Sequence, residues 1–430
     1  MAARVCKFLL MILLFSGGLL LCAEEKDGKI PADPLRDKGM AGDVAAQMEL
    51  GNQYFFGDKR PRNYTIAAWW FRKAALQNCR EAQFNLGLCY ENGLGVKKDR
   101  YQAFQFYKQA AEGRIQPALL NMAIAYMQGI PGSDPDSENA HSGVPVDREK
   151  AFNILVMLKT ERFIPAYREL ADWHLSLDPD EQTADDLKKA FEYAKYAAEH
   201  GDADAMRILA DCYYLGRGCA PDPAAMFEWI ERSARRGNIE ALAKLAWCYE
   251  YGNGCKPDED RAFKLYQKAA SSGLPMAMTK LGDCYTAGKY VKQDIAEALK
   301  WYKQAAESDN SKAIFRLGVF AAQGVGMEVD QRKAAEYFLR AARLGDVHAQ
   351  FNIACYFMEG NGIPADIGAA FYWFSKAAQR GDARAQRRLG ICYLQGLGVE
   401  KNTAEAAKWL EKSARNGDPE AIKLLSMEEE

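Results

Sequence analysis

The sequence is poor in the residues and motifs from which enzymes usually build a reaction centre. Its 430 residues contain neither the H-E-x-x-H motif of metalloproteases nor the G-x-S-x-G motif of serine hydrolases. The C-x-x-C and cysteine–histidine spacings of zinc sites are also absent. The only four histidines occupy unrelated positions of the repeat described below: His141, His174, His200 and His348. We therefore expect no catalytic residue, no metal site and no cofactor.

The chain also lacks a strong excess of either charge. Its formal net charge is -2 and its pI is about 6.2. A nucleic-acid-binding protein usually carries a basic patch or a high pI, so this balance argues against a nucleic-acid partner.

The longest apolar run is confined to the N-terminus. Arg4 and Lys7 precede the run 8–21, and Ala23 follows it. A membrane span needs roughly 20 apolar residues, so we interpret residues 1–23 as a signal peptide that is cleaved after Ala23. We expect an exported protein, periplasmic or secreted, without a membrane span; lipidation at Cys22 or a retained anchor are the alternatives. The polar residues 24–40 are expected to form a flexible tether.

What the sequence does contain is one unit copied about ten times. Two columns of mostly aromatic residues recur, largely 36 positions apart. A period in the thirties is typical of helical solenoids. The first column is Trp70, Phe106, Ile154, Tyr193, Trp229, Leu265, Trp301, Tyr337, Trp373 and Trp409. The second is Tyr54, Tyr90, Tyr126, His174, Tyr213, Tyr249, Tyr285, Ala321, Phe357 and Tyr393.

The clearest copy predicts a helix, a glycine turn and a second helix. Ala82, Leu86 and Tyr90 are spaced four apart and share one helix face. The turn 93–95 begins and ends with glycine, and Asp99 is placed to cap the second helix. Because one helix pair cannot bury its own apolar face, we expect neighbouring copies to stack.

Small residues are expected to set the spacing between helices. Gly87 and the pair 110–111 let two helices approach closely, while the large aromatic column fills the remaining space. A glycine after the second helix also keeps the period, with Ser308 substituting in one copy. Residues 418–425 begin an eleventh first helix and are predicted to cap the C-terminus.

The segment LGLCYENGLGVKKD, followed by AFQFYKQAAEG, resembles the Sel-1-like repeat, a relative of the tetratricopeptide repeat. The resemblance covers residues 41–425 and leaves an acidic tail at 426–430. It implies an all-α fold: a right-handed α/α superhelical solenoid of about ten helix-turn-helix repeats of roughly 36 residues, used for protein–protein contact. It implies no catalytic residues.

Two copies depart from the pattern. The third carries an insert of about 12 residues between Gly129 and Val146, with an acidic tip at 134–138. The fourth lacks the glycine pair and has His174 in the tyrosine column. The insert is either a tolerated surface loop or a hinge or partner-specific lip.

Two cysteine pairs are spaced seven residues apart across the glycine turn: Cys212/Cys219 and Cys248/Cys255. In an exported protein these pairs are disulfide candidates, and small buried apolar residues are the alternative.

The first helices offer the best candidate binding surface. Positions opposite the predicted core face are apolar early and late in the chain and charged in the middle, where Arg168 and Asp172 belong to the same register. Such a surface suits an extended or helical peptide, unless these residues pack against the next copy. The candidates are Phe84, Leu88, Leu120, Ile124, Arg207, Asp211, Trp247, Phe315, Phe351 and Ile391.

These observations favour an exported, non-enzymatic scaffold that binds a protein or peptide, and we expect it to be a monomer. Two alternatives remain open. One is a hydrolase acting on cell-wall or β-lactam-like substrates, which would need a nucleophile with an aligned base. The other is an adaptor subunit of a secretory-pathway quality-control complex.

Overall fold

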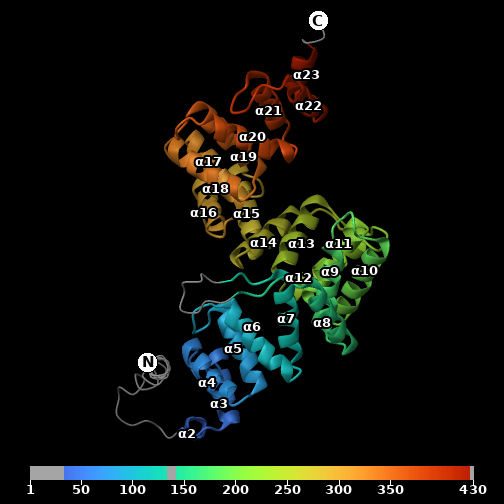
Figure 1. The fold of residues 1–430 in the computed structure, drawn as a ribbon, viewed down its shortest axis with the longest axis vertical. Helices are drawn as coiled ribbons and strands as arrows, with labels where there is room; N and C mark the ends of the chain where they lie inside the picture. The colour runs from blue at the N-terminus through green and yellow to red at the C-terminus, as the bar shows by residue number, and fades with distance from the viewer. Residues whose placement is uncertain (1–32, 133–141, 427–430) are drawn as a thin grey trace. The chain divides into compact units, whose positions relative to one another are not determined.

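The described part of the chain is built from helices alone. The structure is a computed structural model that describes residues 33–132 and 142–426, and within these ranges it contains 22 helices and no strand (Figure 1). The predicted signal peptide and most of the predicted tether and acidic tail lie outside these residues. The chain divides into unit 1 (Met1–Ile208 and Arg217–Cys219) and unit 2 (Leu209–Gly216 and Ala220–Glu430), each described by itself.

The helices follow one another in pairs, as the repeat predicts. A short helix α2 (Pro34–Met40) precedes the first pair. The first helices of the pairs are α3 (Val44–Phe56), α5 (Arg80–Asn92), α7 (Gln116–Gln128), α9 (Ile164–Leu175), α11 (Ala203–Leu215), α13 (Ile239–Tyr251), α15 (Pro275–Ala287), α17 (Ser311–Gln323), α19 (Val347–Glu359), α21 (Ala383–Gln395) and the capping α23 (Pro419–Ser426). The second helices are α4 (Tyr64–Leu76), α6 (Arg100–Glu112), α8 (Arg148–Thr160), α10 (Ala184–Glu199), α12 (Pro223–Arg235), α14 (Glu259–Ser271), α16 (Ile295–Glu307), α18 (Gln331–Arg343), α20 (Ile367–Gln379) and α22 (Thr403–Arg415).

A pair of hydrogen bonds closes the turn within each regular copy. The side chain of Asp99 accepts a bond from the Gln102 N–H at 2.9 Å and so caps α6, as predicted. The backbone N–H of Asp99 donates to the carbonyl of Tyr90 at 2.8 Å. The corresponding bond recurs in unit 2, for example from Asp258 to Tyr249 at 2.9 Å. The tyrosine column therefore marks the last carbonyls of the first helix, which would otherwise lack a partner.

The predicted packing of small against large residues is confirmed, but one position later than expected. Most of the predicted aromatic column is half-buried, and Trp70 is fully buried. The column one residue further along the second helices is more consistently buried and mostly large: Phe71, Tyr107, Leu155, Ala194, Ile230, Tyr266, Tyr302, Phe338, Phe374 and Leu410. An ideal Cβ added to Gly87 would lie 2.6 Å from the Tyr107 ring, so only glycine permits this approach.

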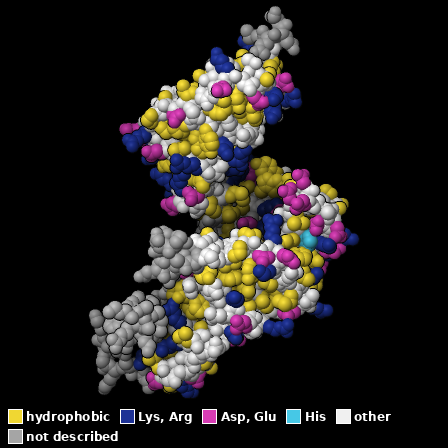
Figure 2. All heavy atoms as spheres, viewed as in Figure 1, with side chains coloured by type: hydrophobic (Ala, Val, Ile, Leu, Met, Phe, Trp, Pro, Cys, Tyr) yellow, Lys and Arg dark blue, Asp and Glu magenta, His cyan; other side chains and the backbone are white. Residues whose placement is uncertain are grey.

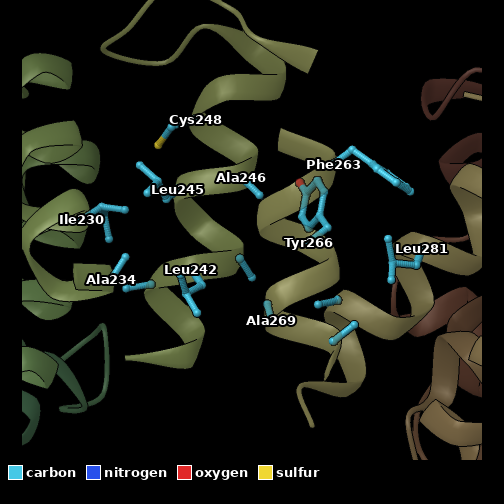
Figure 3. Close-up of a cluster of buried hydrophobic side chains, with 14 of the residues drawn as sticks. Ile230, Ala234, Leu242, Leu245, Ala246, Cys248, Phe263, Tyr266, Ala269 and Leu281 are labelled. Carbon is cyan, nitrogen blue, oxygen red and sulfur yellow. The ribbon is translucent and has the colours of Figure 1, made fainter. Parts of the chain in front are cut away.

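The sixth copy, in unit 2, shows the same arrangement with Ala246 in place of the glycine. In Figure 3, Ile230 and Ala234 of α12 face the Leu242 and Leu245 side of α13, while Tyr266 lies on its other side. These residues belong to one buried cluster, and burial of an aliphatic side chain of this size stabilises the fold by roughly 1.5–3 kcal/mol. Each helix therefore packs on both of its neighbours, which explains why single copies are not independent.

Two expectations need correction. Residues 34–40 of the predicted tether form helix α2, because Pro34 opens it, the Asp33 side chain caps it and Gly39 packs against Leu50 and Trp70. The residue in the glycine stop column is Asp309, with a φ of 53°, and not Ser308. The capping helix α23 is confirmed.

The irregular third and fourth copies keep the helical frame. Ile130 and Val144 exchange two backbone hydrogen bonds of 2.8 Å at the base of the insert, and both side chains are buried. In the fourth copy, Nδ1 of the buried His174 lies 2.9 Å from Asp186 Oδ1. Hydrogen bonds from Thr183 lower the pKa of Asp186 to about 2, so this carboxylate stays ionised. The acidic tip of the insert, residues 134–138, lies outside the described residues.

Candidate protein-interaction face

The ten candidate residues lie on the first helices and define the candidate interaction face. Nine of them remain half-buried after the helices of their own unit have packed, so they keep accessible surface. Leu120 is the exception, because it is only 7% exposed and belongs to the core of α7, α8 and α9. Figure 2 shows apolar side chains interspersed with basic and acidic ones on the viewed surface.

In unit 1, the early part of this face is apolar. Phe84 and Leu88 of α5 pack against the cluster around Tyr107, and the Phe84 and Tyr107 ring centroids are 5.9 Å apart. Ile124 of α7 lies beside a hollow of about 40 Å³ that Glu91 and Tyr107 also line. That volume holds only a few water molecules, so the surface here is a contact area and not a ligand pocket.

The charged part of unit 1 is a compact ion-pair network. Arg168 of α9 binds Glu169 at 2.7 Å and approaches Asp202 at 3.3 Å and Asp204 at 3.4 Å. Together with the neighbouring Asp172, these residues place four carboxylates beside two guanidinium groups, those of Arg168 and Arg207. The residues that the sequence placed here therefore do lie together, in an acidic setting.

The acidic surroundings change the pKa of Asp172. Its side chain is exposed at the surface, yet desolvation by the neighbouring side chains raises its pKa, and the negative charge of Glu169 raises it further. The positive charges of Arg207 and Arg168 oppose the shift, and the resulting pKa is about 6. A carboxylate that titrates near pH 6 makes this part of the face sensitive to mild acid.

In unit 2, Trp247 is the centre of an aromatic group. Its ring lies 5.3 Å from that of Tyr214 and 6.0 Å from that of Tyr251, measured between centroids. Tyr214 is 44% exposed and Tyr251 is 59% exposed, so the group presents rings to solvent. Lys244 forms an ion pair with Asp211 and lies 5.4 Å from the Tyr214 ring centroid. Aromatic and cationic side chains of this kind are enriched where proteins bind one another.

The sequence did not point to Glu250, the most enclosed charged group described at this face. Its side chain is 1% exposed, and Oε1 accepts bonds from Lys280 at 2.9 Å, Lys289 at 2.9 Å and Tyr290 at 3.0 Å. Burial alone would raise the pKa of Glu250, but hydrogen bonds from Lys289, Lys280 and Tyr266 outweigh it and lower the pKa to about 2. The one sequence signal was Tyr290, which stands where most copies have the second turn glycine and adopts a φ of 70°.

The predicted disulfide in the sixth copy is not formed in this structure. Cys248 and Cys255 are both thiols, and the Cys255 Sγ lies 3.5 Å from the Cys248 carbonyl oxygen, not bonded to its sulfur. Burial raises the pKa of the Cys248 thiol to about 12, and the pKa of Cys255 is raised for the same reason. Cys248 therefore behaves as a small apolar core residue, and a bond between Cys212 and Cys219 stays a prediction.

A shallow hollow of about 500 Å³ lies over α16 and Gly326, away from the first helices. Within residues 33–132 and 142–426, no group of three or more histidine, cysteine or carboxylate side chains could hold a metal ion. None of the helices described is both long and apolar enough to cross a bilayer.

Paired helices that stack on one another through buried small and large residues define an α-solenoid. The chain belongs to the Sel1 repeat family. The Sel1 repeat model matches ten segments: 44–79, 80–114, 116–142, 164–202, 203–238, 239–274, 275–310, 311–346, 347–382 and 383–418. The resemblance and the solenoid fold expected from the sequence are thereby confirmed. Proteins of this family are protein-interaction scaffolds and are not typically enzymes.

Curated relatives match parts of the chain. One is the ERAD-associated E3 ubiquitin-protein ligase component HRD3 of Candida glabrata, with 39% identity over 71 residues, which is 16% of this chain and 8% of HRD3. Another is the uncharacterized protein NMB1327 of Neisseria meningitidis, with 28% identity over 162 residues, which is 38% of this chain and 30% of that protein. The chain therefore spans less than a third of the length of either relative.

Solved structures share the fold over more of the chain. A protective antigen with an SLR fold from uropathogenic Escherichia coli strains has 26% identity and a TM-score of 0.51, and the match covers 91% of this chain and 84% of the antigen. A Sel1 repeat protein from Oxalobacter formigenes has 30% identity and a TM-score of 0.51, and the match covers 53% of this chain and 94% of that protein.

Proposed function

We propose that this chain is an exported, non-enzymatic adaptor that binds segments of partner proteins along its first helices. The observation that carries the proposal is the exposure left on that face. Trp247, Phe315 and Phe351 are large side chains that remain half-buried although each unit has a complete core. Half-exposed aromatic residues on several first helices supply the anchors that an extended or helical peptide needs.

Site-specific photo-crosslinking tests this proposal without disturbing the packing. A photoreactive amino acid would be placed at Leu88, Trp247 or Phe351 on first helices, and at Tyr372 or Trp409 on second helices as matched controls. Tyr372 is 52% exposed and Trp409 is half-buried, so both controls are as reachable as the test positions. We expect partner crosslinks at the first-helix positions only. Equal crosslinking at the control positions, or none at any position, would refute the assigned face.

Export is a separate part of the proposal and rests on residues 1–23. The charged start, the apolar run and Ala23 support a cleaved signal peptide. Intact mass and N-terminal sequencing of the chain from its host should show a mature protein that begins at Glu24. A protein that retains Met1, or one that carries lipid on Cys22, would exclude this form of export. We propose that the mature protein acts as a monomer, which light scattering measures.

The similarity to HRD3 favours a second candidate, an adaptor of a secretory-pathway quality-control complex. That similarity extends over 16% of this chain. If this candidate is correct, the crosslinked partners should be subunits of a ubiquitin-ligase complex. Recovery of partners that belong to no such complex would leave the general adaptor function in place and remove this candidate.

A further inference from the structure

The face of α17, α19 and α21 in unit 2 differs in charge from the other first helices. These three helices contain five lysine and arginine residues and one acidic residue. The first helices α3, α5, α7 and α9 of unit 1 contain two basic and five acidic residues. Four of these five basic side chains come in pairs spaced four apart, Lys312 with Arg316 and Arg384 with Arg388, and residues at this spacing share a helix face. The fifth, Arg387, forms ion pairs with Asp418 and Glu420.

Aromatic side chains lie between these cations. The Arg384 guanidinium carbon is 4.3 Å from the centroid of the Phe351 ring, which links α21 to α19. The rings of Phe315 and His348 are 5.9 Å apart, which links α19 to α17. Ile391 adds an apolar, half-buried position on α21. Phe315, Phe351 and Ile391 therefore form one apolar strip with positive charge along it. The basic strip is the name used here for these three residues together with Lys312, Arg316, Arg384 and Arg388.

The protein itself neutralises only part of this charge. Arg316 pairs with Asp283 at 3.0 Å, and Arg384 pairs with Asp382 at 2.9 Å. Lys312 and Arg388 are exposed, and neither forms an ion pair or a side-chain hydrogen bond with any residue that the structure describes. Positive potential next to exposed apolar surface is complementary to a ligand that combines negative and apolar side chains.

We infer that the basic strip binds an acidic segment of a partner protein in which aspartate or glutamate residues flank bulky apolar residues. This inference rests on the proposed function and adds the chemistry of the partner. Neighbouring packed helices are about 8–10 Å apart, and an extended peptide advances about 3.3 Å per residue. The cations lie on α17 and α21, on either side of α19, which has no lysine or arginine. Acidic residues about five to six positions apart therefore meet the two sets of cations. The apolar residues between them contact Phe315, Phe351 and Ile391.

Selection of a phage-displayed library of random 12-residue peptides on the full chain tests the inference. We expect the selected peptides to be enriched in aspartate and glutamate next to leucine, isoleucine or phenylalanine. Their affinity should fall at least tenfold in the double variant Lys312→Glu/Arg388→Glu. It should also fall as salt rises from about 50 to 300 mM, because screening weakens exposed charge pairs.

The matched control is Lys264→Glu/Lys333→Glu, which makes the same change in net charge at exposed positions of α14 and α18. Circular dichroism checks that both variants fold. An equal loss of affinity in the control, or selected peptides without excess acidic residues, would overturn the inference. Neutral peptides that still need Trp247 or Phe351 would overturn it while the proposed function stands. If no peptide is selected and no first-helix crosslink forms, both proposals fail.

Discussion

Unit 2 keeps the repeat spacing that unit 1 breaks. Each step from Trp229 to Trp409 is 36 residues, whereas the steps from Phe106 to Ile154 and from Ile154 to Tyr193 are 48 and 39 residues. The helices pair in the same way in both units, and α9 and α10 pack as the regular pairs do. The difference teaches that the fold does not depend on the length of the turn, since the helix packing survives its interruption.

Both units keep a hydrogen-bond donor for the backbone carbonyl of the residue in the tyrosine column. Across the insert, the Asp147 N–H still donates to the Tyr126 carbonyl at 2.9 Å, as the shorter turns do. In the fourth copy the Gln182 side chain donates to the His174 carbonyl at 2.7 Å instead. A buried carbonyl without a partner is costly, so this bond tolerates a change of donor but not its loss.

The largest expected effect lies in the regular turn of unit 2. Gly254 has a φ of 74°, and an added Cβ would lie 2.0 Å from the Pro223 carbonyl oxygen. Gly254→Ala combines backbone strain with a clash against fixed backbone, so we expect a loss of about 3–4 kcal/mol in the free energy of unfolding. Urea denaturation followed by circular dichroism measures it.

The control for this prediction is Gly273→Ala in the same unit. Gly273 has a φ of 93° and no neighbour within 4 Å of an added Cβ, so only backbone strain of about 1–2 kcal/mol remains. Equal losses in the two variants would show that the contact with Pro223 does not constrain the turn.

The second prediction concerns Glu250 in unit 2. Glu250→Gln leaves Lys280 and Lys289 without their buried carboxylate, so we expect a loss of about 3 kcal/mol at pH 7. The folded-state pKa of about 2 lies below the usual value, so this stabilisation is present above about pH 4.5 and is lost as the pH falls towards 2. The difference between variant and wild type should therefore shrink in acid. The exposed Glu307→Gln is the control, and a loss that does not change with pH would contradict the ionised state of Glu250.

The sequence predicted the helices, the turns and the capping aspartates because each leaves a local pattern. It placed the buried column one residue too early, because the Phe106 column and the Tyr107 column recur with the same period of the repeat, and the period alone does not show which of them faces the core. Polar contacts between individual side chains left no repeated pattern, whether they lie between copies or within one. Tyr290 donates a hydrogen bond to Glu250, which lies 40 residues earlier in the chain. The contact between His174 and Asp186 exists because the fourth copy has another turn in place of the glycine turn.

The third prediction tests that replacement turn in unit 1. Thr183 accepts a bond from the Asp186 N–H at 3.1 Å, and Asp186 accepts one from the Thr183 N–H at 3.0 Å, which together form a capping box at the start of α10. Thr183→Ala should cost about 1 kcal/mol of unfolding free energy, whereas Thr183→Ser should retain most of it. Hydrogen exchange of the first turn of α10 reports the effect locally. Equal protection in the alanine and serine variants would mean that the hydroxyl does not hold the turn.

The smallest expected effect concerns the acidic part of the face in unit 1. A folded-state pKa of about 6 at Asp172 lies above the usual aspartate value, so its ionised form opposes folding at neutral pH, and this penalty disappears as the pH falls through about 6 towards 4. Asp172→Asn should therefore raise the thermal midpoint by roughly 1–2 °C at pH 7.5 and leave it unchanged at pH 4. Asp180→Asn, at an exposed position of the following loop, is the control. A rise that persists at pH 4 would show that the asparagine acts through its hydrogen bonds, because the charge it removes is no longer present there.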